Sequence, residues 1–181
     1  MAFQPKAVDI VCLGDSITQK FEWQDALPGW RVANRGIGSD TTRGMLSRLD
    51  SVTALAPSII SLMAGINDLG NRTPEDTAES FAALLDAISQ DLPECKVIVS
   101  SVLPVAETHP IDNKNVCILN DAIKSLCQER GLRYLDIYDA FADEDGYLKP
   151  EYDMDTVHLT PEGYRVWLSY LIPALAEILT S

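Results

Sequence analysis

The stretch VCLGDSITQ, residues 11–19, is a short apolar run that stops abruptly at Gly14, Asp15 and Ser16. The apolar part resembles a buried β-strand, and glycine, aspartate and serine are common in turns and at helix caps. One interpretation is that these residues only form a turn and a helix cap. A serine held at the end of a buried strand can also act as a nucleophile, and the rest of the chain has to decide between the two interpretations.

The bulk composition describes an ordinary globular protein. The chain has 181 residues, of which 46% are hydrophobic and 7% aromatic. This length suits one domain with a sizeable core, so we expect residues 1–181 to fold as a single domain. No apolar run approaches the ~18 residues of a membrane span. The first ten residues lack the basic and then apolar pattern of a signal peptide, and we therefore expect a cytoplasmic protein.

The net charge limits the possible partners, and the cysteines indicate the redox state of the compartment. A net charge of −13 disfavours nucleic acid and anionic membrane surfaces as partners. The four cysteines have no metal-ligand spacing and are expected to be reduced thiols in a reducing compartment. They are Cys12, Cys95, Cys117 and Cys127.

Apolar runs alternate with helical patterns along the chain. Strands are expected at residues 8–13, 31–34, 58–63, 96–101 and 133–137. Helices are expected at 41–55, from 73 to at least 88, at 115–130 and at 160–179, with Pro173 kinking or breaking the last. Several strands are almost continuously apolar, which is typical of strands covered on both faces. The alternation predicts an α/β domain with a doubly wound parallel sheet.

Small polar segments follow four of these runs. They are GDS (14–16), NRGIGSDTT (34–42), AGINDLG (64–70) and DTVH (155–158). In an open parallel sheet, ligands bind outside the carboxyl ends of the strands. We therefore expect these four segments to meet at one edge of the sheet.

The residue types in these segments suit acyl transfer, which needs a nucleophile, a base, an orienting acid and oxyanion donors. Ser16 can be the nucleophile and His158 the base, with Asp155 three residues earlier to orient the ring. Backbone N–H groups of Ser16 and of residues 36–39, and the amide of Asn67, can donate to an oxyanion. Taken singly, these features are equally typical of turns and of a helix entry. Their placement at one edge favours the catalytic interpretation.

Other site chemistries lack their motifs. The sequence has no G-x-S-x-G around Ser16, no G-x-x-x-x-G-K and no G-x-G-x-x-G, which disfavours a strained nucleophile elbow and phosphate-cradling folds. A zinc site normally needs three or four ligands, whereas Asp155 and His158 offer two. We therefore expect neither a metal nor a cofactor.

Together the four segments resemble the SGNH, or GDSL-type, hydrolase family, in the family's order and over almost the whole chain. The resembling motifs are GDSIT (14–18), NRGIGSDTT (34–42), GIND (65–68) and DTVH (155–158). The resemblance implies a flavodoxin-like three-layer α/β/α sandwich with a five-stranded parallel sheet, and cofactor-free hydrolysis of esters or thioesters. The second motif, with RGMLSRLD (43–50), resembles the branch of platelet-activating-factor acetylhydrolase catalytic subunits, which implies short acyl groups, often acetyl.

Carried over residue by residue, the resemblance implies Ser16 as nucleophile and first oxyanion donor, His158 as general base, Asp155 as its partner and Asn67 as an oxyanion donor. One position departs from the family pattern. Where the family usually has an oxyanion-donating glycine before Asp-Thr, this chain has Ser39, with Gly38 one residue earlier. The N–H of either residue is therefore a candidate donor.

The sequence thus predicts a serine esterase that hydrolyses small esters through an acyl-enzyme. The substrates expected, in order, are an O-acetylated carbohydrate, a short-chain phospholipid-like ester and a thioester. The alternatives are a lysophospholipase- or thioesterase-type acyl hydrolase and a non-catalytic flavodoxin-like domain that binds a small ligand. A homodimer is compatible with the sequence. Further pocket candidates, each with a more ordinary structural role open to it, are Trp23, Trp30, Arg35, Arg43, His109, Tyr147 and Tyr152.

Overall fold

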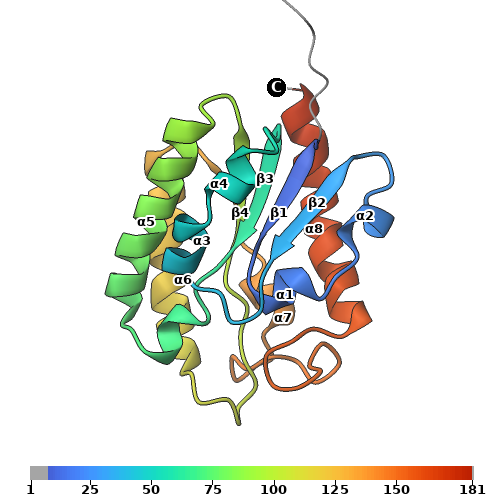
Figure 1. Cartoon of the computed structure of the whole chain (residues 1–181). Coiled ribbons are helices and arrows are strands. Elements are labelled where there is room, and N and C mark those ends of the chain that lie inside the picture. Colours follow the sequence, from blue (N-terminus) through green and yellow to red (C-terminus); the bar gives the residue numbers. More distant parts are fainter. Residues whose placement is uncertain (1–7, 181) are drawn as a thin grey trace, which may run out of the picture.

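Five parallel strands form one sheet in the order β2-β1-β3-β4-β5 (Figure 1). The structure is a computed structural model that describes residues 8–180, so the first seven residues, on which part of the localisation prediction depends, lie outside it. The strands are β1 Ile10–Gly14, β2 Val32–Gly36, β3 Ile59–Met63, β4 Lys96–Ser100 and β5 Arg133–Leu135. The predicted parallel sheet is confirmed, with β5 two residues shorter than expected.

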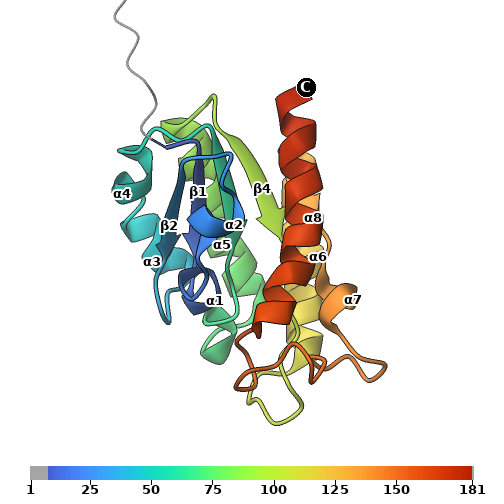
Figure 2. The ribbon, with the colours of Figure 1, turned by 90° about the vertical axis from the view of Figure 1, so that its right-hand side faces the viewer.

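Helices cover both faces of the sheet, which explains why β1 and β3 are buried at every position. One face carries α3 Thr42–Ser47, α4 Asp50–Thr53, α5 Pro74–Asp91 and α6 Asn113–Glu129. The other carries α1 Ser16–Gln19, α2 Trp23–Ala26, α7 Tyr138–Phe141 and α8 Pro161–Thr180. Figure 2 shows α8 on one side of the sheet, and α3 and α4 on the other. The predicted three-layer α/β/α sandwich is confirmed.

Alternate residues of β1 belong to two separate cores. Val11 and Leu13 pack with the α3–α6 side, whereas Ile10 and Cys12 pack with the α8 side. All four are at most 1% exposed. Cys12 is therefore a small core residue, as its place in an apolar run predicted.

The single helix expected at 41–55 is wrong, because the chain forms α3 and α4 with a turn at Arg48 between them. Arg48 is the C-cap of α3, with φ −112°. Its guanidinium reaches back to Asp40 and to two carbonyl groups at the ends of β1 and β2. These bonds hold Arg48 where the helix would otherwise continue.

The break expected at Pro173 does not occur, since α8 continues from Pro161 to Thr180. A proline removes one helical hydrogen bond and crowds the preceding turn. Leu171, Ala174 and Leu175 around it are at most 1% exposed, so their packing against the sheet holds the helix together. Along residues 8–180, no helix combines the length and apolarity needed to cross a membrane.

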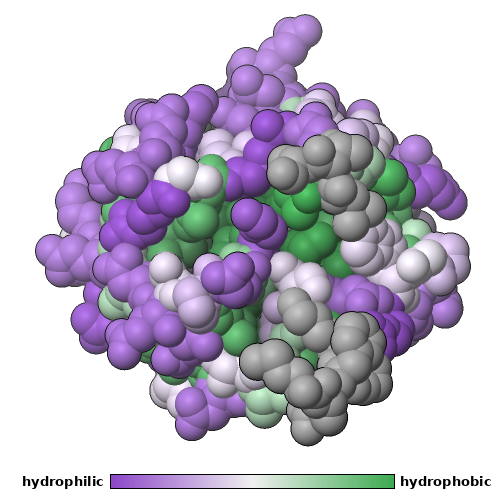
Figure 3. Space-filling view, turned by 90° about the horizontal axis from the view of Figure 1, so that it is seen from above, coloured by the Kyte–Doolittle hydropathy of each residue, from purple (hydrophilic) through white to green (hydrophobic). Residues whose placement is uncertain are grey.

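The amino end of the sheet, seen in Figure 3, mixes hydrophilic residues with smaller apolar patches. A pocket of about 440 Å³ lies near the starts of β4 and β5, where Lys96 and Arg133 are among its lining residues. Its lining contains no histidine. The polar segments singled out from the sequence all lie at the opposite end.

Candidate active site

Ser16 is the first residue of α1, directly after the end of β1. Asp15 caps this helix, with Oδ1 accepting a hydrogen bond of 2.9 Å from the N–H of Ile17. The Asp15 side chain is buried, and that burial raises its pKa to about 7. Asp15 therefore acts as a helix cap and shapes the turn that presents Ser16.

Gly14 makes this sharp turn possible. A Cβ at this position would overlap the Thr18 hydroxyl and would lie 2.8 Å from the carbonyl oxygen of Met63. Real Cβ atoms essentially never approach so closely, so the close approach of β1, β3 and α1 requires a glycine here. The glycine of the GDS segment thus has a steric role beside the serine.

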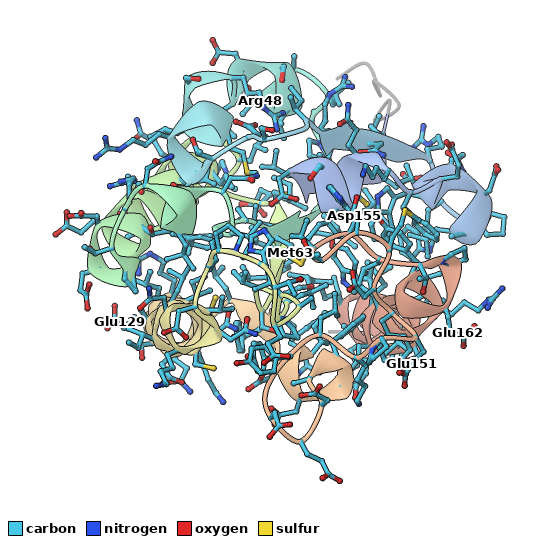
Figure 4. The ribbon with its side chains drawn as sticks, turned by 90° about the horizontal axis from the view of Figure 1, so that it is seen from below. Arg48, Met63, Glu129, Glu151, Asp155 and Glu162 are labelled. Carbon is cyan, nitrogen blue, oxygen red and sulfur yellow. The ribbon has the colours of Figure 1, made fainter. Side chains whose placement is uncertain are left out.

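Ser16 meets His158 although 142 residues separate them. His158 Nε2 lies 2.7 Å from Ser16 Oγ. On the other side of the ring, Nδ1 lies 2.7 and 2.8 Å from the two carboxylate oxygens of Asp155. The Nδ1–H therefore donates to the carboxylate, and Nε2 is free to accept the serine proton. Figure 4 looks onto this end of the sheet and labels Asp155 in the loop before α8.

The turn from Asp155 to His158 is held in a strained conformation. Thr156 has φ +82°, which is unfavourable for a β-branched residue. Its N–H donates to Asp153 Oδ1 at 2.6 Å, and the N–H of His158 donates to Asp155 Oδ1 at 3.0 Å. Such strain persists only where the surroundings impose it, and it gathers at functional sites. Here it holds the Asp155 carboxylate against Nδ1 of His158, while Nε2 of the same ring faces Ser16.

Asp155 is ionised but not deeply buried. Partial desolvation opposes its charge, yet the hydrogen bonds from the ring and backbone N–H of His158 and the charges of His158 and Lys20 lower its pKa below the ordinary value. The carboxylate is 47% exposed, and Lys20 Nζ lies 3.8 Å away. An ion pair so exposed contributes little energy by itself.

Two of the predicted oxyanion donors lie in the same pocket as Ser16. They are Ser39 and Asn67, whereas Gly38 is not part of that lining. Within residues 8–180 no hydrogen bond uses the N–H of Ser16, Gly38 or Ser39. The Asn67 amide donates one hydrogen to the Asp40 carbonyl at 2.9 Å, which orients the amide and leaves its second hydrogen available.

Ser39 adopts a conformation that favours glycine. Its φ is +60°, in the left-handed region. This conformation agrees with the glycine that the resemblance implies for this position. Ser39 lines the pocket and Gly38 does not. A left-handed conformation costs a residue with a Cβ about 1–2 kcal/mol.

Ser39→Gly is therefore expected to raise the free energy of unfolding by about 1 kcal/mol, since glycine removes the strain but gains entropy when unfolded. Urea titration followed by circular dichroism measures this change. Ser47→Gly, in helix α3, is the matched control and should lower stability by roughly 0.5–1 kcal/mol. A loss of stability in Ser39→Gly would contradict the strain argument.

Arg48, which is labelled in Figure 4, forms hydrogen bonds with three segments of the chain. Its Nε donates to Asp40 Oδ2 at 2.7 Å, and one terminal nitrogen donates to the carbonyl groups of Arg35 at 2.9 Å and Gly14 at 3.3 Å. Since Asp40 also holds the Asn67 amide, this cluster connects the ends of β1 and β2 with both candidate oxyanion segments. Arg48 is not among the predicted site residues, although its place eight residues after Asp40 is visible in the sequence.

A second cluster fixes the segment that follows Asn67. The buried carboxylate of Asp68 accepts from the N–H of Thr42 at 3.0 Å and from its hydroxyl at 2.7 Å. Arg72 lies 3.5 Å from the same carboxylate and donates to Ser80 Oγ at 2.7 Å. Asp68 thereby ties η1, Asp68–Gly70, to the start of α3.

These side chains border a pocket of about 260 Å³. Its lining is Ser16, Ser39, Ile66, Asn67, Gly70, His109, Pro110, Ile111, Val157 and His158. Of the further candidates from the sequence, His109 alone is part of this lining. The others are Trp23, Trp30, Arg35, Arg43, Tyr147 and Tyr152.

Several of those other candidates have structural roles. Trp23 is 2% exposed and packs edge-on against Trp167 with ring centroids 5.0 Å apart. Tyr152 packs against Phe141. Tyr147 borders a different pocket. The aromatic residues therefore belong to the α8-side core and to a neighbouring loop.

The residues at the site do not form a metal centre. In the part of the chain that the structure describes, no group of three or more His, Cys, Asp or Glu side chains could hold a metal ion. Asp155 and His158 are engaged with each other and with Ser16. This set of side chains has the composition that a serine nucleophile and its base would need.

Comparison with known proteins shows similarity to acylhydrolases. The GDSL-like Lipase/Acylhydrolase family model matches residues 12–166. The platelet-activating factor acetylhydrolase IB subunit alpha2 of Homo sapiens is 32% identical over 167 residues, which cover 88% of this chain and 72% of that protein. The structure of a GDSL-like lipase from Bacteroides thetaiotaomicron has a TM-score of 0.82 at 26% identity and covers 98% of this chain and 93% of the other.

A more distant structure shares the fold. A variant of an acetyl-xylooligosaccharide esterase from Geobacillus Stearmophilus has a TM-score of 0.75 at 19% identity, over 93% of this chain and 94% of the other. The comparisons give no support to the alternative of a non-catalytic ligand-binding domain, and they agree with the resemblance to the acetylhydrolase branch. This chain belongs to the GDSL-like lipase/acylhydrolase family and is a carboxylic-ester hydrolase.

Proposed function

We propose that the protein is a serine esterase that removes short acyl groups, chiefly acetyl, from small esters through an acyl-enzyme. The observation that carries this proposal is the 2.7 Å contact between Ser16 Oγ and His158 Nε2, with Asp155 on the far side of the ring. A serine hydroxyl is a weak nucleophile until a base within hydrogen-bond reach takes its proton. His158 is such a base.

In the acylation step, Ser16 Oγ attacks the ester carbonyl carbon while its proton passes to His158 Nε2. The carbonyl oxygen becomes an oxyanion that accepts hydrogen bonds from the N–H groups of Ser16 and Ser39 and from the Asn67 amide. The intermediate collapses when the bond to the alcohol oxygen breaks, and His158 returns the proton to that oxygen. Ser16 then carries the acyl group as an ester.

Deacylation repeats the sequence with water in place of serine. His158 takes a proton from the water, the resulting hydroxide attacks the acyl carbon, and the same donors hold the second oxyanion. When the bond to Ser16 Oγ breaks, His158 returns the proton to the serine. The carboxylic acid leaves and no cofactor takes part.

The size of the pocket supports a short acyl group. Its volume of about 260 Å³ is below the usual range of drug-sized ligand sites. The human relative carries the name acetylhydrolase. The expected substrates, in order of preference, are an O-acetylated carbohydrate, a short-chain phospholipid-like ester and a thioester. A lysophospholipase-type activity is the alternative.

Labelling with a fluorophosphonate tests the proposal directly, because this probe forms a covalent bond with a serine only when a base activates it. We expect one label per chain, mapped by mass spectrometry to Ser16. Ser16→Ala should take up no label, whereas Ser125→Ala, at an exposed serine of α6, should label like the unaltered protein. Labelling that persists in Ser16→Ala would overturn the assignment of the nucleophile.

Asn67→Ala is expected to lower kcat for p-nitrophenyl acetate by about 10²–10³ and to change KM little, because the donated hydrogen bond is strongest to the oxyanion. Steady-state kinetics measure both constants. Asn71→Ala removes an exposed amide from the next turn of the chain and should leave both unchanged. A loss in kcat below tenfold for Asn67→Ala would remove Asn67 from the oxyanion donors.

A further inference from the structure

His109 is the second histidine of the chain, and it lines the pocket that holds Ser16 and His158. Its loop, after β4, is fastened to the turn that carries Asp155 and His158. The N–H of Ala106 donates to the carbonyl of Thr156 at 2.8 Å, and the N–H of His109 donates to the carbonyl of Ala106 at 3.0 Å. The imidazole is therefore held in a defined place relative to the nucleophile.

The hydrogen bonds of His109 assign its tautomer. Nδ1 lies 3.2 Å from the N–H of Ile111 and accepts a hydrogen bond from it. A ring nitrogen that accepts carries no proton, so the neutral ring has its hydrogen on Nε2. Burial lowers the pKa of His109, although the charge of Asp155 acts in the opposite direction, and the neutral form therefore persists at neutral pH.

The Nε2–H of His109 is a donor without a protein partner, since no hydrogen bond in residues 8–180 uses it. The same pocket is also lined by apolar residues, namely Ile66, Pro110, Ile111 and Val157. In the proposed mechanism the ester carbonyl oxygen goes to the oxyanion donors, and an acetyl methyl group accepts no hydrogen bond. A substrate acceptor for His109 would therefore be on the alcohol half of the ester.

The chemistry of the donor favours a neutral acceptor. A phosphate-bearing alcohol would call for a cation, as Arg and Lys supply in phosphate sites. Neither Arg35 nor Arg43, the arginines nearest in sequence to the oxyanion segment, lines the pocket, and its lining contains no lysine. A single neutral N–H suits a hydroxyl or ether oxygen close to the scissile bond.

We propose that His109 is a substrate-binding residue whose Nε2–H donates to a hydroxyl or ether oxygen beside the ester bond in the alcohol half, as in a partly acetylated sugar. This assignment rests on the proposed function, and it selects the acetylated carbohydrate above the phospholipid-like ester. It makes His109 a determinant of alcohol specificity with no part in proton transfer.

A matched pair of esters tests this proposal. trans-2-Hydroxycyclohexyl acetate and cyclohexyl acetate differ only in the neighbouring hydroxyl group. We expect the unaltered protein to show a higher kcat/KM for the hydroxylated ester, by about tenfold, the factor that one net hydrogen bond supplies. His109→Leu keeps a similar volume without the donor and should reduce this ratio to near one. His109→Gln places an amide N–H near the same point and should restore part of it.

The outcomes separate this proposal from the proposed function. Turnover of neither ester, together with no label on Ser16, contradicts the esterase itself and this assignment with it. Turnover of both esters with equal kcat/KM in the unaltered protein overturns the role of His109 alone. An equal loss on both esters in His109→Leu indicates a structural role and also overturns it. If His109→Leu fails to fold, ¹⁵N NMR of the unaltered protein provides the test. We then expect the Nε2–H tautomer of His109 and a shift of its Nε2 resonance when trans-1,2-cyclohexanediol is added. The absence of a shift contradicts the contact.

Discussion

His158→Ala is expected to lower kcat for p-nitrophenyl acetate by about 10⁶, the loss seen when a serine hydrolase loses its base. Without an acceptor 2.7 Å from Ser16 Oγ, the serine would have to lose its proton to water in the transition state. A factor of 10⁶ corresponds to roughly 8 kcal/mol of transition-state stabilisation. The oxyanion donors and the pocket remain, so a residual rate of about 10³ over water is expected.

The double variant Ser16→Ala with His158→Ala is the decisive comparison. Groups that act as one unit are not additive, so the double variant should be about as slow as either single variant. Thermal unfolding of all three variants provides the control for folding. If the two losses multiply in the double variant, Ser16 and His158 act independently and the proposed mechanism is wrong.

The spatial meeting of Ser16 and His158 could be predicted from the sequence because topology alone brings the strand ends together. Each near-continuous apolar run ends at a small polar segment, and parallel strands place those ends at one edge. The position of His158 follows from the same rule, since Asp155 comes just before the last helix. This prediction needed only the positions of the strands along the chain and their parallel arrangement.

The supporting contacts could not be predicted in the same way. The helical spacing of apolar residues placed Arg48 inside one long helix. That spacing carries no information about which carbonyl groups the guanidinium binds. The bonds from Arg48 to Asp40, Arg35 and Gly14 depend on how three loops approach one another. Pro173 shows the opposite case, in which buried neighbours outweigh a local propensity to break the helix.

Backbone conformation favours Ser39 over Gly38 as the proposed oxyanion donor. The sequence left both N–H groups open, because a backbone donor carries no side-chain signature. The left-handed φ of Ser39 and its place in the pocket wall favour Ser39 in our proposal. His109 was visible as a candidate, but its role depends on which ring nitrogen accepts a bond from Ile111, and that is a property of the folded loop.

Asp155→Asn is expected to lower kcat by about 10³–10⁴, with a small effect on KM. In the structure, Asp155 Oδ1 accepts from the backbone N–H of His158 at 3.0 Å, and both carboxylate oxygens lie within 2.8 Å of Nδ1. An asparagine has one acceptor oxygen. If this oxygen keeps the backbone bond, its NH₂ group faces Nδ1 and forces the ring proton onto Nε2, where it blocks acceptance of the serine proton.

Steady-state kinetics and ¹⁵N NMR of the imidazole test this argument together, since the variant should show the Nε2–H tautomer as well as the slower turnover. Asp91→Asn, at an exposed carboxylate that ends α5, is the control and should leave kcat unchanged. The alternative is that solvent orients the His158 ring. Asp155 is 47% exposed, so water can reach the ring and replace the lost acceptor. If Asp155→Asn lowers kcat by less than tenfold, solvent orients His158 adequately, and the catalytic unit consists of Ser16 and His158 alone.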